Sequence, residues 1–105
     1  ATISATMKHE TNGEIHELAL SGRLDSNEAK KFAAKAEDLL GSSARKVVVN
    51  LEHVTFLCSA ALRVIVLNHK KFKADGRQFV VSKTSKDVDF IFATFGIGSS
   101  EWIWD

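Results

Sequence analysis

The run VVVNL at residues 47–51 is apolar at every position except Asn50. A strand with one solvated face alternates apolar and polar residues, whereas a parallel strand covered on both faces reads as a continuous apolar run. After the further apolar run VTFL at residues 54–57, residues 59–75 contain no glycine or proline and carry apolar side chains at helical spacing. The sequence therefore predicts a central parallel strand that leads directly into a helix.

Toward the N-terminus, two alternating runs at residues 3–7 and 16–20 flank Asn12-Gly13. This pattern predicts a β-hairpin, and the Asn-Gly pair favours a type I′ turn. Asp25 and Glu28 then have the spacing of a helix N-cap and its companion acid. The apolar residues that follow keep helical spacing until Gly41, which indicates a first helix.

Toward the C-terminus, FVV at residues 79–81 predicts a second buried strand. Thr84 and Asp87 can cap a third helix that ends at Gly96, and residues 102–104, WIW, predict a short final strand. The order β-β-α-β-α-β-α-β predicts an α/β fold over residues 1–105 as a single domain. We expect a mostly parallel sheet of about five strands with an N-terminal hairpin and three main helices.

Composition argues against several functional classes. The net charge of +1, from 14 basic and 13 acidic residues, lacks the basic excess expected for direct nucleic-acid binding. No apolar run approaches the roughly 20 residues of a membrane span, and the polar residues 1–9 do not resemble a signal peptide. One cysteine and four scattered histidines form no metal-ligand spacing, so we expect no metal, no cofactor and a reducing, cytoplasmic location. The oligomeric state is not determined by these features.

Two loops are the places to look for function, because binding sites in parallel sheets lie where strands end and helices begin. These loops are residues 22–26 and residues 56–62, and we expect adjacent strands to bring them together. Within the second loop, Ser59 has the position of an N-cap for the following helix. A helix N-terminus also favours a phosphate, so Ser59 is at the same time a candidate switch, with Arg63 four residues on to pair with the added charge.

The outer side of that helix is unusually apolar, since Ala60, Val64 and Leu67 lie opposite the predicted core residues. Two interpretations remain open. Either another element of the fold covers these side chains, or they form an exposed apolar patch of the kind that marks a partner site.

Cys58 suggests a different, enzymatic hypothesis. A thiol at a helix N-terminus, followed by Arg63 at C-x4-R spacing, resembles the anion-binding loop of rhodanese-like sulfurtransferases. Such loops use glycine so that backbone N–H groups can surround an oxyanion, whereas residues 59–62 read SAAL, which favours helix. A buried structural cysteine fits these residues better.

Several segments taken together resemble the STAS domain, whose best-known members are the bacterial anti-sigma factor antagonists. The segments are GRLD at residues 22–25, VVVNL at 47–51, VTFLCSAAL at 54–62, GRQFVV at 76–81 and FATFGI at 92–97. The resemblance implies a regulatory binding module that is not an enzyme. It implies Ser59 as a phosphoacceptor, an anti-sigma factor serine kinase and a phosphatase as partners, and a partner-contact surface formed by Asp25, Cys58, Ala60, Arg63, Val64 and Leu67.

Three positions depart from the family pattern. Ala60 stands where the family often has a second serine, and Ala61 where it often has a glycine. Cys58 stands where the family usually has an aspartate before the phosphoacceptor. This difference leaves open an alternative in which the chain is a constitutive STAS subunit of a lipid-transport or signalling complex and is not phosphorylated.

Overall fold

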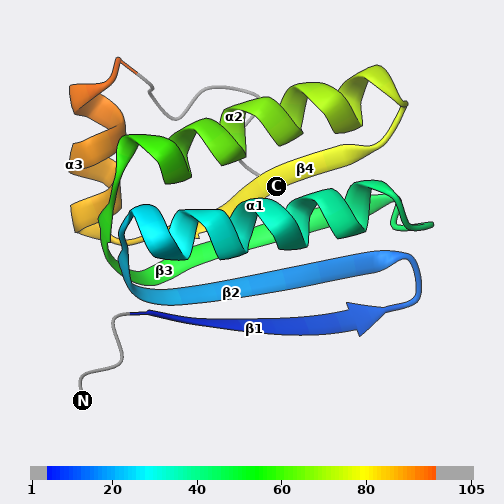
Figure 1. The fold of residues 1–105 in the computed structure, drawn as a ribbon, viewed down its shortest axis with the longest axis horizontal. Helices are drawn as coiled ribbons and strands as arrows, with labels where there is room; N and C mark the ends of the chain where they lie inside the picture. Colours follow the sequence, from blue (N-terminus) through cyan, green and yellow to red (C-terminus); the bar gives the residue numbers. More distant parts are fainter. Residues whose placement is uncertain (1–4, 97–105) are drawn as a thin grey trace.

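The computed structural model describes residues 5–96, and it has the predicted α/β architecture. Within these residues four strands and three helices follow one another in the order β1-β2-α1-β3-α2-β4-α3, and Figure 1 shows their arrangement. Their bounds are β1 Ala5–Asn12, β2 Ile15–Leu24, α1 Ser26–Leu40, β3 Lys46–Leu57, α2 Ser59–Ala74, β4 Gln78–Thr84 and α3 Lys86–Thr94.

The sheet has the spatial order β1-β2-β3-β4. β1 pairs with β2 in antiparallel orientation, and β2, β3 and β4 are parallel. The prediction of a mostly parallel sheet with an N-terminal hairpin is thus confirmed, and β3, which contains the VVVNL run, is an interior strand. The structure has four strands within residues 5–96, and the predicted fifth strand at residues 102–104 lies outside the described residues.

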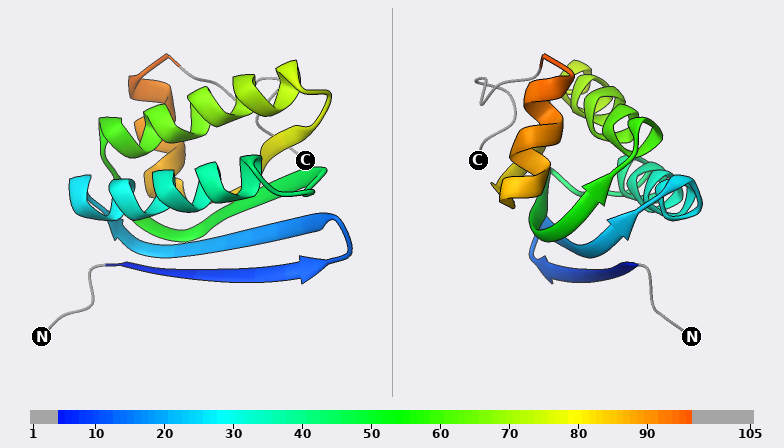
Figure 2. Two further views of the ribbon diagram at one scale, coloured as in Figure 1. Left: turned by 45° about the vertical axis from the view of Figure 1, so that its right-hand side comes forward. Right: turned by 90° about the vertical axis from the view of Figure 1, so that its left-hand side faces the viewer.

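α1 and α2 lie side by side over one face of the sheet (Figures 1 and 2). Their buried apolar side chains belong to one hydrophobic cluster that also contains buried side chains of the strands. Phe79 of β4 contacts both helices, with its ring centroid 6.4 Å from that of Phe32 in α1 and 5.4 Å from that of Phe72 in α2. Aromatic burial of this kind dominates core energetics, so Phe79 joins the helix pair to the sheet.

α3 stands at the end of the sheet where β2 and β3 finish (Figure 1). It buries Val88 and Phe92, which join the same hydrophobic cluster. Its N-cap is Ser85, whose hydroxyl accepts a hydrogen bond from the Val88 N–H at 3.1 Å and donates to the Val54 carbonyl. The prediction that Thr84 and Asp87 cap this helix was therefore wrong by one residue, because Ser85 satisfies the helix N–H and β3 together.

The hairpin turn also differs from the prediction. Asn12 pairs with Ile15, so the two turn residues are Gly13 and Glu14. A type I′ turn requires a positive φ at both of these residues. Within residues 5–96 only glycines have a positive φ, and Gly13 has φ 65°. The turn is therefore not type I′, because Glu14 keeps the negative φ that an L-residue with a side chain prefers.

Candidate functional site

The two loops singled out in the sequence meet at the rim where β2 and β3 end. Leu24 pairs with Leu57 at the last step of the parallel ladder. The Cys58 N–H then donates a hydrogen bond to the Leu24 carbonyl at 3.0 Å. This bond joins the start of α2 to the end of β2. Asp25 and Ser59 each come directly after one of the two bonded residues, so both lie at the same rim of the sheet.

Asp25 caps α1, as the sequence predicted. Its Oδ1 accepts a hydrogen bond from the Glu28 N–H at 3.0 Å, and its backbone is extended, with φ −79° and ψ −173°. The side chain is half-buried. The carboxylate therefore stabilises the helix N-terminus and still reaches the surface of the rim.

Ser59 does not cap α2, and the prediction that it would was wrong. The N-cap of α2 is Cys58, with φ −76° and ψ 167°, and its side chain makes no cap hydrogen bond. Ser59 is instead the first residue of the helix and is exposed. An N-cap must have extended backbone angles, and here those angles fall one residue earlier than the serine. The Ser59 hydroxyl is consequently not used to hold the helix end.

Cys58 is a half-buried free thiol packed against the hydrophobic cluster. The helix begins at the next residue, and no residue from 54 to 62 has a positive φ. A loop that surrounds an oxyanion needs several backbone N–H groups turned toward one point. A strand that passes directly into a helix lacks such a loop, which argues against the rhodanese-like hypothesis.

The apolar side chains that the sequence placed on the outer side of α2 face a groove between α2 and α1. Ala60, Arg63, Val64 and Leu67 line this groove from α2, and Ala33 and Glu37 line it from α1, with a volume of about 220 Å³. Leu67 keeps 45% of its surface exposed, whereas Val64 is half-buried against the core. Both open interpretations of these side chains are thus partly right, since α1 covers one side of them and leaves a surface groove with apolar and charged lining.

Sequence reasoning missed Arg23, which lies in the first of the two loops. Its guanidinium carbon lies 4.4 Å from the centre of the Phe56 ring, the residue with which Arg23 is paired in the parallel ladder. A cation over an aromatic face is held in place without using its N–H donors. The only sequence signal was an arginine and a phenylalanine each one residue before the end of its strand.

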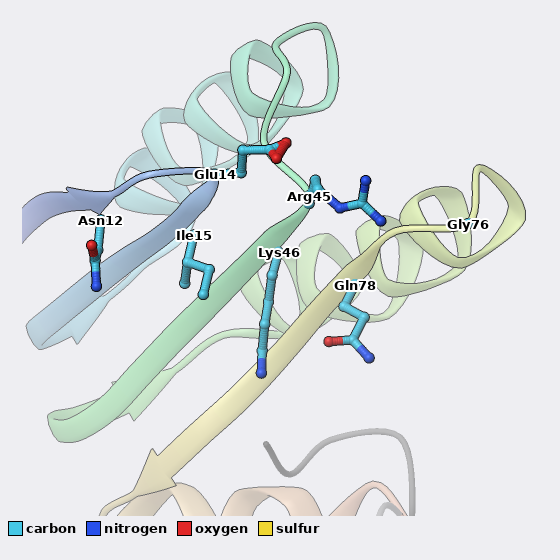
Figure 3. Close-up of a pocket in the computed structure, with 7 residues that line it drawn as sticks. All are labelled: Asn12, Glu14, Ile15, Arg45, Lys46, Gly76 and Gln78. Carbon is cyan, nitrogen blue, oxygen red and sulfur yellow. The ribbon is translucent and has the colours of Figure 1, made fainter.

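A larger pocket, of about 510 Å³, lies at the opposite end of the sheet, where the parallel strands begin. Figure 3 shows Asn12, Ile15, Lys46 and Gln78 projecting to one side of the four strands. Binding loops in parallel sheets lie at the carboxyl ends of strands, where helix N-termini converge. This pocket lies at the amino ends of the parallel strands. The rim around Ser59 therefore remains the stronger candidate site, although the groove beside it has a smaller volume.

Within residues 5–96, no group of three or more histidine, cysteine or acidic side chains has the arrangement of a metal site. None of the three described helices is long and apolar enough to cross a bilayer.

Fold and rim together define a class of protein, an α/β module in which two strand-to-helix loops meet at one rim of a mostly parallel sheet. The STAS domain family model matches residues 6–105, and the chain belongs to this family. The structure of the anti-sigma factor antagonist SpoIIAA in its unphosphorylated form is similar, with a TM-score of 0.80 and 20% identity over 95% of this chain and 87% of that chain.

Two further solved structures are similar in fold. The Bacillus cell fate determinant SpoIIAA in the phosphorylated form has a TM-score of 0.76 and 20% identity, over 95% of this chain and 90% of that chain. An anti-sigma factor antagonist from Mycobacterium paratuberculosis has a TM-score of 0.78 and 18% identity, over 93% of this chain and 88% of that chain. At such low identity the likeness concerns the fold.

Proposed function

We propose that this chain is an anti-sigma factor antagonist, a cytoplasmic regulatory binding module of one domain over residues 1–105 without catalytic activity. In this proposal Ser59 is phosphorylated by an anti-sigma factor serine kinase and dephosphorylated by a phosphatase. The unphosphorylated form binds the anti-sigma factor and releases its sigma factor. Asp25, Cys58, Ala60, Arg63, Val64 and Leu67 form the contact surface.

The observation that carries the proposal is the position of Ser59. It is exposed, it is the first residue of α2, and its hydroxyl is not the cap of that helix. A kinase can therefore modify the hydroxyl without removing a bond that holds the helix end. The added charge of about −1.5 to −2 at a helix N-terminus is favoured by the helix dipole, so the fold tolerates the phosphate.

The same phosphate would oppose binding of a partner. Ser59 directly precedes Ala60, the first residue of α2 that lines the groove between α1 and α2. A partner seated over Leu67 and Val64 must remove water from the neighbouring surface, and a dianion resists that removal. Phosphorylation of Ser59 would therefore weaken an apolar contact without changing the fold.

The direct test is phosphorylation in vitro. The purified chain is incubated with ATP and the kinase-type anti-sigma factor of its own organism, and the intact mass is measured. We expect one phosphate on the wild type and none on Ser59→Ala. Ser26→Ala is the matched control, because Ser26 is likewise an exposed first residue of a helix, α1. A phosphate that persists on Ser59→Ala, or that is absent from the wild type, would contradict the switch.

Cys58 favours a second candidate function, because the acid that precedes the phosphoacceptor in this family is replaced by an uncharged thiol. In this alternative the chain is a constitutive STAS subunit of a lipid-transport or signalling complex. Affinity purification from the source organism separates the two. Recovery of a transporter ATPase together with an unphosphorylated Ser59 favours the second function, and recovery of a kinase-type anti-sigma factor favours the first.

A further inference from the structure

The outer edge of β1 is open. β1 is the first strand in the sheet order, and no other element within residues 5–96 lies along its outer side (Figures 1 and 2). Asn12 and Ile15 flank the two-residue turn, so these two residues exchange backbone hydrogen bonds with each other. Because bonded and non-bonded pairs alternate in an antiparallel ladder, the N–H and C=O groups of Met7, His9 and Thr11 point away from β2. These groups are a template for one more strand.

The charged side chains of this edge form a pattern that is complementary to itself. Lys8 and Glu10 project from the same face of β1, with Lys8 Nζ 3.4 Å from Glu10 Oε1, and both are exposed. When a second copy of β1 runs antiparallel to the first, a two-fold axis at His9 places Lys8 of each copy opposite Glu10 of the other. An axis at Lys8 would place two lysines opposite each other, and an axis at Glu10 two glutamates. Facing opposite charges stabilise a strand pair and facing like charges destabilise it, so the charges favour the axis at His9.

A second copy would also offset a repulsive pair within the hairpin. Glu10 faces Glu17 of β2, and like charges directly opposite each other destabilise a strand pair. Lys8 faces Ala19, so within the chain it approaches Glu10 only from along the strand. Lys8 of a second copy would lie on the side of Glu10 that faces away from Glu17. It would therefore add a positive charge next to two carboxylates.

The other face of β1 is compatible with the same axis. His9 is hydrogen-bonded to its own chain, with Nε2 2.7 Å from Nδ1 of His16. Burial, the Lys35 ammonium of α1 and the neighbouring His16 lower the pKa of His9 from its ordinary value of 6.5, so two copies of this ring meet uncharged at pH 7. Met7 is 38% exposed and lines a groove of about 170 Å³ between the sheet and α1. The axis at His9 places Thr11 of the second copy opposite Met7, where it covers part of this exposed apolar surface.

We propose that this chain forms a two-fold dimer through its β1 edges, with His9 at the axis and Lys8 of each copy opposite Glu10 of the other. The two sheets become one continuous sheet, and Met7 of each copy exchanges backbone hydrogen bonds with Thr11 of the other. Each β1 has 8 residues, and a contact of this size is smaller than a standard protein interface, so we expect a dissociation constant in the micromolar range. Because α2 takes no part in the contact, the dimer is independent of the function proposed for the rim around Ser59.

The test is sedimentation equilibrium of the purified chain from micromolar to millimolar concentration. Lys8→Glu and Glu10→Lys should each weaken dimerisation by about 10- to 100-fold, because each turns both attractive pairs at the axis into repulsive ones. The double variant Lys8→Glu/Glu10→Lys restores opposite charges in both pairs and should dimerise like the wild type. An equimolar mixture of the two single variants should also dimerise, because one copy is then acidic and the other basic at both positions. Lys83→Glu is the matched control, since Lys83 is an exposed lysine of β4, and it should dimerise like the wild type.

Thr11→Pro tests the backbone part of the contact. Proline removes an N–H that points away from β2, so the hairpin is kept and dimerisation should be lost, with circular dichroism to verify the fold. A wild type that stays monomeric at millimolar concentration would overturn the proposal. A mixture of the two single charge variants that stays monomeric would also overturn it, as would a dimer that Thr11→Pro leaves unchanged.

Discussion

At the residue scale, Asp25 and Ser59 show how closely a sequence pattern can be interpreted. Both begin helices after a strand, and both have the chemistry of an N-cap. Only Asp25 is one, since its Oδ1 accepts the Glu28 N–H. The cap of α2 falls on Cys58 because the extended backbone angles occur there. Residue type predicted a helix start at both places, but which residue has the cap angles depends on where the strand pairing ends.

This difference gives a prediction about stability. Asp25→Ala should lower the free energy of unfolding by about 1 kcal/mol, because it removes the cap acceptor. Asp25→Asn keeps an acceptor oxygen and should retain most of the stability that the cap provides. Ser59→Ala should change the free energy of unfolding by less than about 0.5 kcal/mol. Urea denaturation followed by circular dichroism measures all three. A loss of about 1 kcal/mol in Ser59→Ala would mean that its hydroxyl does cap α2.

At the scale of elements, the helices and strands were predicted well where apolar periodicity is long. The run at residues 47–51 predicted the interior strand β3, and the uninterrupted residues 59–75 predicted α2. The contacts between elements were harder to predict from the sequence. His9 and His16 were two of four scattered histidines in the sequence, and their 2.7 Å contact could not be predicted because it depends on the register of β1 against β2. The register follows from turn geometry and burial together, which the sequence pattern does not resolve.

The burial of His9 should make the stability of the folded chain sensitive to acid. The pKa of His9 is lower in the folded chain than its ordinary 6.5, because of burial, Lys35 and His16. Below pH 6.5 the unfolded chain binds a proton that the folded chain resists, so the unfolded state gains stability. The free energy of unfolding should therefore be highest above pH 6.5 and should fall as the pH decreases toward the lowered pKa.

Urea midpoints between pH 7.5 and pH 5 measure this effect. His9→Gln should show a smaller decrease over that range than the wild type, because the titrating group with the lowered pKa is gone. His53→Gln, which removes an exposed histidine, should follow the wild type. An equal decrease in His9→Gln and the wild type would assign the acid sensitivity to other groups.

At the scale of the whole molecule, distant segments are joined by a residue that no pattern singled out. Arg77, just before β4, donates hydrogen bonds from Nη2 to the Leu40 carbonyl at 2.7 Å and from Nη1 to the Ala44 carbonyl at 2.8 Å. Its guanidinium also lies 4.8 Å from the ring centre of Phe72 in α2. The acceptors are 33 and 37 residues away in sequence, and both are backbone atoms, so residue types carry no signal of them.

Arg77 should therefore contribute strongly to stability. Its side chain is 16% exposed, and it satisfies carbonyls at the end of α1 and at the entry to β3 that would otherwise lose their partners. Arg77→Ala should lower the free energy of unfolding by about 2–4 kcal/mol. Arg77→Lys should recover only part of this, since the single nitrogen of an ammonium cannot span the two carbonyls that Nη1 and Nη2 of the guanidinium reach separately. Arg45→Ala, which removes an exposed arginine nearby, should change the free energy of unfolding by less than about 0.5 kcal/mol. Equal urea midpoints for Arg77→Ala and Arg45→Ala would show that α1, β3 and β4 hold together without this side chain.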